Sequence, residues 1–293
     1  MKILLTGKNG QIGFELAKKL SVLGEVIATD RQELDLADPD AIRVFIEKTK
    51  PDIIINPAAY TAVDKAESEP NLAYQINTLA SEVLASMATE LDIPLIHFST
   101  DYVFDGLKQE AYVETDPTNP QSVYGKTKCD GEEKVRRHSK QIILRTSWVF
   151  GSHGNNFLKT ILRLIMEKES LNIVSDQWGS PASALMLADV TFKIVDTIFK
   201  NKNFKDYGTY HVTNDGETNW YDYASLILSE AMKLNLKVTC APDKIHPIPT
   251  LEYPTAATRP LNSRLNTDKI KKTFMLELPH WESEVKKVLR EII

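Results

Sequence analysis

Two side chains able to move a proton lie one helical turn apart in the stretch NPQSVYGKTKCDGEEKV, residues 119–135. A helix is expected to begin near Ser122, so Tyr124 and Lys128, at positions i and i+4, would share one face of it. Tyrosine ordinarily holds its proton up to a pKa of about 10, and a neighbouring ammonium favours the phenolate. The pair is therefore a candidate acid–base unit. The same spacing also occurs by chance on helix surfaces, so the rest of the chain must support the chemistry.

The length and composition bound what the chain can be. Its 293 residues, 42% hydrophobic and 26% charged, suffice for one large or two modest domains. The formal net charge of −5 gives no electrostatic basis for binding nucleic acid or an anionic membrane. Cys129 and Cys240 lie far apart without metal-ligand spacing, which predicts free thiols in a reducing compartment. No segment resembles a signal peptide or reaches membrane-spanning length, so a cytoplasmic location is expected.

The first half of the chain alternates short apolar runs with amphipathic segments. Strands are predicted at residues 2–6, 25–29, 52–56, 94–99 and 141–147, and helices at 11–22, 38–48, 71–91 and 122–137. Such alternation is typical of a parallel sheet covered by helices on both faces. The predicted fold is therefore α/β, a Rossmann-like doubly wound sheet, with residues 1–150 as a dinucleotide-binding domain.

The second half, residues 151–293, is less regular and is expected to form a smaller, mixed α/β substrate-binding domain. Helices are predicted at residues 155–168, 187–200, 220–233 and 281–292. Short apolar pieces predict a strand near 208–213, returning to the main sheet, and another at 236–240. The proline-rich stretch 241–266 is expected to be an extended loop. The two halves are expected to pack closely, with a cleft between them.

A glycine-rich turn joins the first predicted strand to the first predicted helix. Gly7, Gly10 and Gly13 in TGKNGQIG have G-x-x-G-x-x-G spacing. Glycines there allow positive φ and let backbone N–H groups approach a pyrophosphate at a helix N-terminus, although a tight structural turn would use them too. Asp30 follows the second predicted strand, where a carboxylate can accept hydrogen bonds from ribose hydroxyls. The combination predicts a dinucleotide site.

Further cofactor contacts are expected along the carboxyl edge of the sheet, where such folds bind ligands. Arg31 offers a planar cation to a 2′-phosphate, whereas Asp30 repels one, so both NADPH and NADH are expected to work. The remaining predicted contacts are Gln11, Ile12, Asp35, Leu36, Ala59, Tyr60, Thr61 and Phe98.

Eight motifs are distributed along the chain: TGKNGQIG, NPAAYTAVDKAESEP, FSTDYVFDG, YGKTK, RTSWVFG, GNNF, DQWGSP and RPLNSRLNT. Together they resemble the extended short-chain dehydrogenase/reductases and, within them, the dTDP-4-dehydrorhamnose reductase family. The resemblance implies reduction of a dTDP-linked 4-keto-6-deoxy sugar, dTDP-4-dehydro-L-rhamnose, by NADPH or NADH. It implies that Tyr124 is the proton donor, that Lys128 tunes it and holds the nicotinamide ribose, and that Thr100 binds the substrate carbonyl.

The same resemblance implies further substrate contacts from Asp101, Trp148, Asn156 and Arg259. For Trp148 the alternative is a buried core tryptophan, and for Asn156 and Arg259 it is a structural role. His97 lies inside an apolar strand and is expected to be a buried core histidine with satisfied hydrogen bonds rather than a catalytic one.

Other functions stay open at this point. Dehydratases on the same scaffold carry Asp–Glu after the catalytic threonine, whereas Asp101 and Tyr102 follow Thr100 here. This argues against a 4,6-dehydratase. A reductase of another dTDP-4-keto-6-deoxy sugar remains an alternative. A non-catalytic regulatory subunit resembling that of methionine adenosyltransferase is a second alternative, although the retained Tyr124 and Lys128 argue against it.

Some members of the resembled family dimerise through Mg²⁺ held by acidic residues. Glu15 and Glu291 match two of those positions, but Leu185 stands where the third carboxylate would be. Mg²⁺ requires several hard oxygen ligands, and leucine offers none. A bound metal is therefore not expected, and the chain is expected to be a monomer or a metal-independent homodimer.

Overall fold

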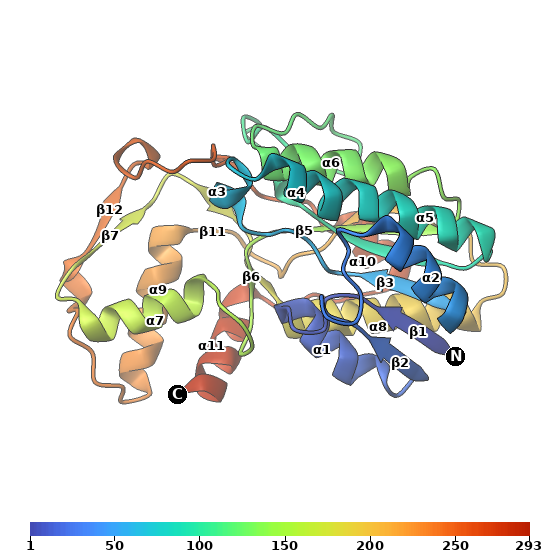
Figure 1. The fold of residues 1–293 in the computed structure, drawn as a ribbon. Helices are drawn as coiled ribbons and strands as arrows, with labels where there is room; N and C mark the ends of the chain where they lie inside the picture. The colour runs from blue at the N-terminus through green and yellow to red at the C-terminus, as the bar shows by residue number, and fades with distance from the viewer.

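The computed structural model describes all of residues 1–293 and is built around a six-stranded sheet (Figure 1). The strands are β1 (Lys2–Leu5), β2 (Glu25–Ala28), β3 (Ile53–Asn56), β4 (Leu95–Thr100), β5 (Gln141–Thr146) and β10 (Gly208–His211). They lie in the order β10-β5-β4-β3-β1-β2, and all neighbours are parallel. The predicted fold class and the strands predicted in the first half are confirmed. The order reverses between β1 and β3, the place where such sheets bind ligands.

Helices cover both faces of this sheet (Figure 1). One face is covered by α1 (Gln11–Leu20), α8 (Ala184–Lys200) and α10 (Asp268–Phe274), and the other by α2 (Pro39–Thr49), α5 (Ala80–Glu90) and α6 (Val123–Val135). Successive residues of a strand point to opposite faces, so β3 contributes Ile55 to the first core and Ile54 to the second. Because both faces are covered, β1 and β3 are apolar except for Lys2 and Asn56 at their ends, and β4 and β5 are buried throughout.

Side-chain caps fix where two of these helices begin. The Asp38 carboxylate accepts from the N–H groups of Asp40 and Ala41, each at 3.0 Å, at the start of α2 as predicted. Ser122 Oγ accepts from Gly125 N at 3.1 Å at the start of α6. The cap sets the register of α6 and so the positions of the two candidate catalytic residues on it.

The helix predicted at 71–91 is divided into three pieces. These are α4 (Pro70–Tyr74), a π-helical turn η1 (Gln75–Leu79) and α5, preceded by the short α3 (Val63–Ala66). Within the turn, the Asn77 side chain accepts from Tyr60 N at 2.8 Å and donates to Thr127 Oγ1 at 3.1 Å. The wider turn thus joins the loop after β3 to α6. Nothing in the hydrophobic pattern distinguishes it from a continuous helix.

The second region has its own core, formed by α7 (Phe157–Glu167), α9 (Trp220–Lys233) and α11 (Trp281–Ile292). Its strands form three separate two-stranded sheets: β6 (Val149–Phe150) with β9 (Ala182–Ser183), β7 (Leu171–Val174) with β12 (Ile245–Ile248), and β8 (Trp178–Gly179) with β11 (Thr218–Asn219). Short 3₁₀ turns occur at η2 (Asp101–Val103), η3 (Pro242–Lys244) and η4 (Thr250–Glu252).

Two predictions for this region are wrong. Residues 236–240 form no strand, because Thr239 N and Cys240 N both donate to Ile165 O at the end of α7. The apolar pattern there reflects packing on the second core. A strand, β12, lies instead within the stretch predicted as loop. It tolerates Pro247 because it pairs with a single neighbour, β7.

The second half of the sequence also completes the main sheet, since β10 pairs with β5 and α8 packs beside α1. The division of the chain near residue 150 stays a prediction. No helix is long and apolar enough to cross a membrane. No three His, Cys, Asp or Glu side chains are grouped to hold a metal ion.

Candidate active site

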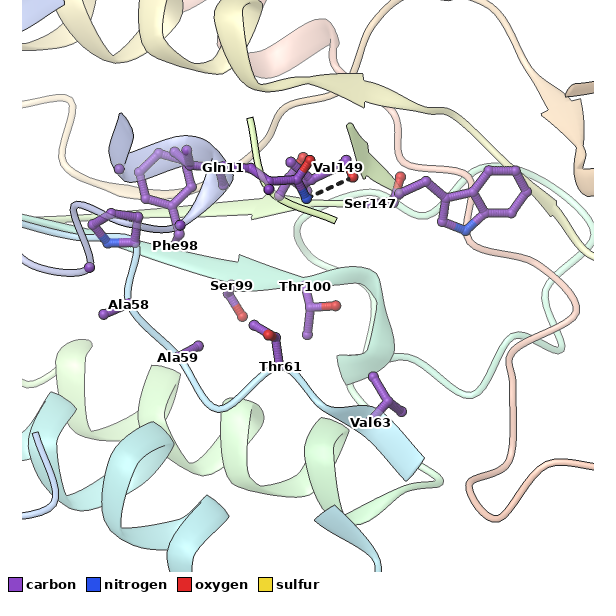
Figure 2. A pocket seen from close by; sticks show the side chains of 18 of the residues that line it. Gln11, Ala58, Ala59, Thr61, Val63, Phe98, Ser99, Thr100, Ser147 and Val149 are labelled. Atoms are coloured by element: carbon purple, nitrogen blue, oxygen red, sulfur yellow. Dashed lines mark hydrogen bonds between the residues drawn. The ribbon is translucent and has the colours of Figure 1, made fainter. Parts of the chain in front are cut away.

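A cavity of about 670 Å³ lies at the carboxyl edge of the main sheet, between that edge and the second region (Figure 2). Gln11, Thr61 and Thr100 stand around it, and Gln11 Nε2 donates to Val149 O at 3.3 Å. Twelve of the predicted site residues line it: Gly7, Gly10, Gln11, Ile12, Gly13, Ala59, Thr61, Phe98, Thr100, Asp101, Tyr124 and Trp148.

The glycine-rich turn forms one wall of this cavity. Gly7 has φ +66°, and a Cβ there would lie 2.9 Å from Ala58 Cβ. A Cβ on Gly13 would lie 2.1 Å from Gly7 O, so the turn can pass so close to α1 only with glycine at that position. No side chain caps α1 at Gly10, which leaves its first N–H groups available to an anionic ligand.

Asp30 lies just beyond the cavity, beside this turn. Its carboxylate accepts from Gln32 N and from Asn9 Nδ2, each at 2.8 Å. The hydrogen bond from Gln32 N is the main reason that the pKa of Asp30 is held below its usual value. Lys8 Nζ lies 3.8 Å from the carboxylate, a cation that the sequence analysis did not consider.

The other predicted cofactor contacts outside the cavity have partners of their own. The largely exposed Arg31 side chain places Nε 3.3 Å from Asp35 Oδ2. The Tyr60 hydroxyl donates to Glu69 Oε2 at 2.6 Å. Leu36 is buried in the core on the α2 side. Whether these residues contact a cofactor stays a prediction.

Tyr124 and Thr100 face each other across the end of β4. Thr100 Oγ1 donates to Asp101 Oδ1 at 3.0 Å, and the Tyr124 ring contacts the Tyr102 ring edge-on at 5.5 Å between centroids. Burial raises the pKa of Tyr124 above its ordinary value, and a hydrogen bond with Thr100 opposes that rise. The sequence predicted the opposite direction, from the charge of Lys128.

The position of the Lys128 nitrogen explains this difference. Nζ donates to Phe98 O at 2.6 Å and lies 3.3 Å from His97 Nε2, so it is directed at β4. Burial lowers the pKa of Lys128 to about 8, and the Glu132 carboxylate opposes the shift. His97 is a buried core histidine, as expected, with Asn56 Nδ2 3.1 Å from its other ring nitrogen.

Three polar atoms without a hydrogen-bond partner lie on residues that line the cavity. They are Asp101 Oδ2, Ser99 Oγ and Thr146 Oγ1, all buried. Burial raises the pKa of Asp101 to about 6. Buried polar atoms normally have partners, so these are available to a ligand. Ser99 and Thr146 were not predicted from the sequence, although both stand where a strand reaches the carboxyl edge.

Two tryptophans form the opposite wall. Trp148 has φ +48°, and its ring stacks on Trp220 with 3.5 Å between centroids and 17° between planes. A Cβ on Gly179 would lie 2.7 Å from the Trp148 ring, so glycine makes room for it. The sequence analysis missed Trp220, which no motif marks as a partner of Trp148.

Asn156 and Arg259, both predicted substrate contacts, lie outside this cavity. Asn156 caps α7 and donates to Gln11 Oε1 at 2.8 Å. Arg259 pairs with Asp64 and donates to the Tyr102 hydroxyl at 3.2 Å. It lines a second cavity of about 500 Å³, which shares Tyr102 with the first.

Known proteins resemble this chain over its whole length. The family described as "RmlD substrate binding domain" matches residues 1–293. A dTDP-4-dehydrorhamnose reductase from Shigella flexneri is 45% identical over 297 residues, covering 100% of this chain and 98% of its own. The crystal structure of such a reductase from Clostridium acetobutylicum has 39% identity and a TM-score of 0.90, covering 100% and 99% of the two chains. Another, from Bacillus anthracis in complex with NADP, has 35% identity, a TM-score of 0.90 and 99% coverage of each chain.

Proposed function

Because the chain belongs to the dTDP-4-dehydrorhamnose reductase family and is an NAD(P)H-dependent oxidoreductase, we propose that it reduces the 4-keto group of dTDP-4-dehydro-L-rhamnose to give dTDP-L-rhamnose. The observation that carries the proposal is the cavity that brings the glycine turn together with Thr100 and Tyr124. A cofactor site and a proton donor are thereby adjacent at the edge of the sheet.

The residues of the turn fit a dinucleotide. The missing Cβ atoms at Gly7 and Gly13, and the uncapped start of α1, suit a pyrophosphate. Asp30 suits an adenosine ribose. When bound, the cofactor supplies the hydride that adds to the carbonyl carbon of the sugar. We assign its other contacts to Gln11, Ile12, Ala59, Thr61, Phe98 and Lys128.

The proton comes from Tyr124. Reduction places negative charge on the former carbonyl oxygen, and the Thr100 hydroxyl turns from Asp101 Oδ1 to donate its hydrogen bond to that oxygen. Because burial raises the pKa of Tyr124, the phenol stays protonated until the alkoxide forms. An alkoxide is a much stronger base than a phenolate, so it then takes the phenolic proton. The Lys128 ammonium, one helical turn away, stabilises the phenolate that remains.

We assign the second region to substrate binding. The stacked rings of Trp148 and Trp220 offer a flat apolar wall to the sugar and its nucleotide. On the sheet side, Asp101 Oδ2 is free to accept from a sugar hydroxyl as well. The Arg259 guanidinium, on the second cavity, suits the diphosphate.

Turnover of a small panel of dTDP-4-keto-6-deoxy sugars tests the proposal. Oxidation of NADPH and NADH is followed by absorbance, and each product is identified by NMR. We expect the highest kcat/KM with dTDP-4-dehydro-L-rhamnose and a product with the L-rhamno configuration. A higher kcat/KM for another sugar would make that sugar the substrate. Absence of turnover with every sugar would favour a non-catalytic regulatory subunit.

A further inference from the structure

The main sheet carries a buried polar layer beneath α6. On this face, three adjacent strands each place a polar side chain two residues after an apolar one. The apolar layer is Leu4, Ile54 and Leu95, and the polar layer is Thr6, Asn56 and His97. Each buried polar group must have a partner or it costs about 1–3 kcal/mol, a requirement that an apolar layer would not impose. The polar layer therefore indicates a role beyond the core.

These side chains form one chain of hydrogen bonds that ends at Lys128. Thr6 Oγ1 donates to Asn56 Oδ1 at 2.6 Å, and Asn56 Nδ2 lies 3.1 Å from His97 Nδ1. His97 Nε2 lies 3.3 Å from Lys128 Nζ, which also donates to Phe98 O at 2.6 Å. The chain thus crosses from β1 to α6 through two intervening strands.

The chain can run in two directions, and each matches one protonation state of Lys128. In the orientation of the structure, the Asn56 amide N–H₂ donates to His97 Nδ1, and Nε2–H then donates to a neutral Lys128 amine. An ammonium can only donate, so His97 Nε2 must then accept, and Nδ1–H donates to the oxygen of an Asn56 amide reversed from that orientation. Thr6 can accept or donate, so it completes either direction.

We propose that His97 is a positioning residue for the reaction proposed above: with Asn56 and Thr6, it holds the Lys128 nitrogen in place in both its ammonium and amine forms. The inference rests on the proposed function, because Lys128 is taken as the partner of Tyr124. His97 does not line the cavity and acts only through Lys128.

The surroundings of Lys128 indicate what loss of His97 would do. Burial lowers the pKa of Lys128 to about 8, and the Glu132 carboxylate opposes this shift. The Glu132 carboxylate is itself held by Arg145, whose Nε and Nη2 donate to its two oxygens at 2.9 and 2.7 Å. Without His97 the ammonium keeps only the Phe98 carbonyl, so its pKa falls further. The other titratable groups near it are Tyr124 on its own helix and Asp101 and Tyr102 of η2. The neighbouring helices α3, α4 and α5 carry Asp64, Lys65, Tyr74, Glu82 and Glu90, of which Asp64, Lys65 and Glu82 pair with Arg259, Glu69 and Lys134.

Three variants separate positioning from general stability. His97→Leu removes both ring nitrogens, and His97→Gln restores an acceptor and a donor on one side chain. His138→Leu is the matched control, because His138 is also buried and bonded, to Ile93 O at 2.8 Å and Thr89 at 2.9 Å, beyond the C-terminal end of α6. Each variant is compared with wild type in the pH profile of kcat/KM. The side-chain ¹⁵N signal of Lys128, assigned with Lys128→Met, is titrated without cofactor or substrate.

We expect His97→Leu to lower kcat/KM about 10- to 100-fold near neutral pH and to move the alkaline limb down by about one pH unit. The Lys128 ¹⁵N titration should move by the same amount, and His97→Gln should recover most of both. An unchanged titration in His97→Leu, or an equal shift in His138→Leu, would overturn the proposal. If His97→Leu does not fold, Asn56→Ala replaces it. The same downward shift of the Lys128 ¹⁵N titration is expected, and an unchanged titration would again overturn the proposal. The ¹⁵N titration involves no turnover, so it decides this inference even if the proposed reaction is wrong.

Discussion

The two walls of the cavity are built in different ways. On the sheet side, parallel ladders fix the ends of β1, β3, β4 and β5, and the capped helix α6 presents Tyr124 and Lys128. On the other side, Trp148 directly precedes the two-residue strand β6, and Trp220 begins α9 directly after the two-residue strand β11. The rings of these two residues hold each other by stacking. Backbone hydrogen bonds therefore set the positions of the groups assigned to chemistry. Contacts between side chains set the positions of the groups assigned to the substrate.

This difference predicts different consequences of substitution. The sheet side is rigid through many hydrogen bonds, so removing one functional group there should leave the geometry intact and lower kcat. Trp148 holds a positive φ that is unfavourable for a bulky side chain and depends on its ring contacts. Substitution on that side should weaken binding and raise KM. The following predictions test this division, from the largest expected effect to the smallest.

Tyr124→Phe should lower kcat about 10³-fold, or about 4 kcal/mol, while leaving the Kd of the cofactor unchanged. The ring still packs against Tyr102, and only the proton donor is lost. Stopped-flow kinetics and fluorescence titration with NADPH measure the two quantities. A kcat near that of wild type would mean that a different group donates the proton. The assignment of proton transfer to the sheet side would then be wrong.

The sequence allowed the sheet side to be predicted well and the other side poorly. Strand and helix periodicity, the glycine spacing and the Tyr124–Lys128 interval are all local, so residues 1–150 could be assigned with little tertiary information. The Trp148–Trp220 stack and the Asn156–Gln11 hydrogen bond join residues far apart in the chain. No local pattern encodes such contacts. The direction of the Tyr124 pKa shift was predicted wrongly for the same reason, because Phe98 and His97 draw the Lys128 nitrogen to β4.

Asp101→Asn should stabilise the protein at pH 7.5 by about 2 kcal/mol. Burial raises the pKa of Asp101 to about 6, so the folded state binds a proton more tightly than the unfolded state. The free energy of unfolding of the wild type therefore falls as pH rises from about 4 to about 6, and it stays lower at higher pH. The amide introduced by Asp101→Asn carries no charge, so the variant does not lose this stability. Urea unfolding of the wild type and the variant at pH 7.5 and pH 4 measures the difference in their free energies of unfolding. The advantage of the variant should nearly vanish at pH 4. Equal effects at both values would mean that ionisation of Asp101 is not the cause.

Trp220→Leu should raise the KM of the sugar substrate about tenfold, or about 1.4 kcal/mol, with kcat within about threefold of wild type. The substitution removes the ring on which Trp148 stacks, and no group assigned to proton transfer changes. Phe199→Leu, a half-exposed aromatic near the end of α8, is the control for general loss of an aromatic side chain. Steady-state kinetics for both variants measure kcat and KM separately. A fall in kcat with unchanged KM would contradict the division between the two walls.

The smallest predicted effect concerns the choice of cofactor at the edge of the sheet. Asp30 favours the ribose hydroxyls of NADH, and the cations beside it favour the 2′-phosphate of NADPH. We therefore expect both cofactors to work, with a preference within about tenfold. In the structure the guanidinium of the largely exposed Arg31 is paired with Asp35, so a 2′-phosphate would have to compete with Asp35 for it. The Lys8 ammonium lies 3.8 Å from the Asp30 carboxylate. Asp30→Ala should weaken NADH and spare NADPH.

Arg31→Ala should lower kcat/KM for NADPH about fivefold, or about 1 kcal/mol, and leave NADH unchanged. The guanidinium can leave an exposed pair with Asp35 at little cost, because such pairs contribute at most about 1 kcal/mol. Lys8→Ala is the matched comparison, since the Lys8 ammonium is already shared between Glu33 and Asp30. Measuring kcat/KM for both cofactors in all variants decides between them. If only Lys8→Ala affects NADPH, the phosphate contact belongs to Lys8 of the glycine turn, and Arg31 takes no part in the choice of cofactor.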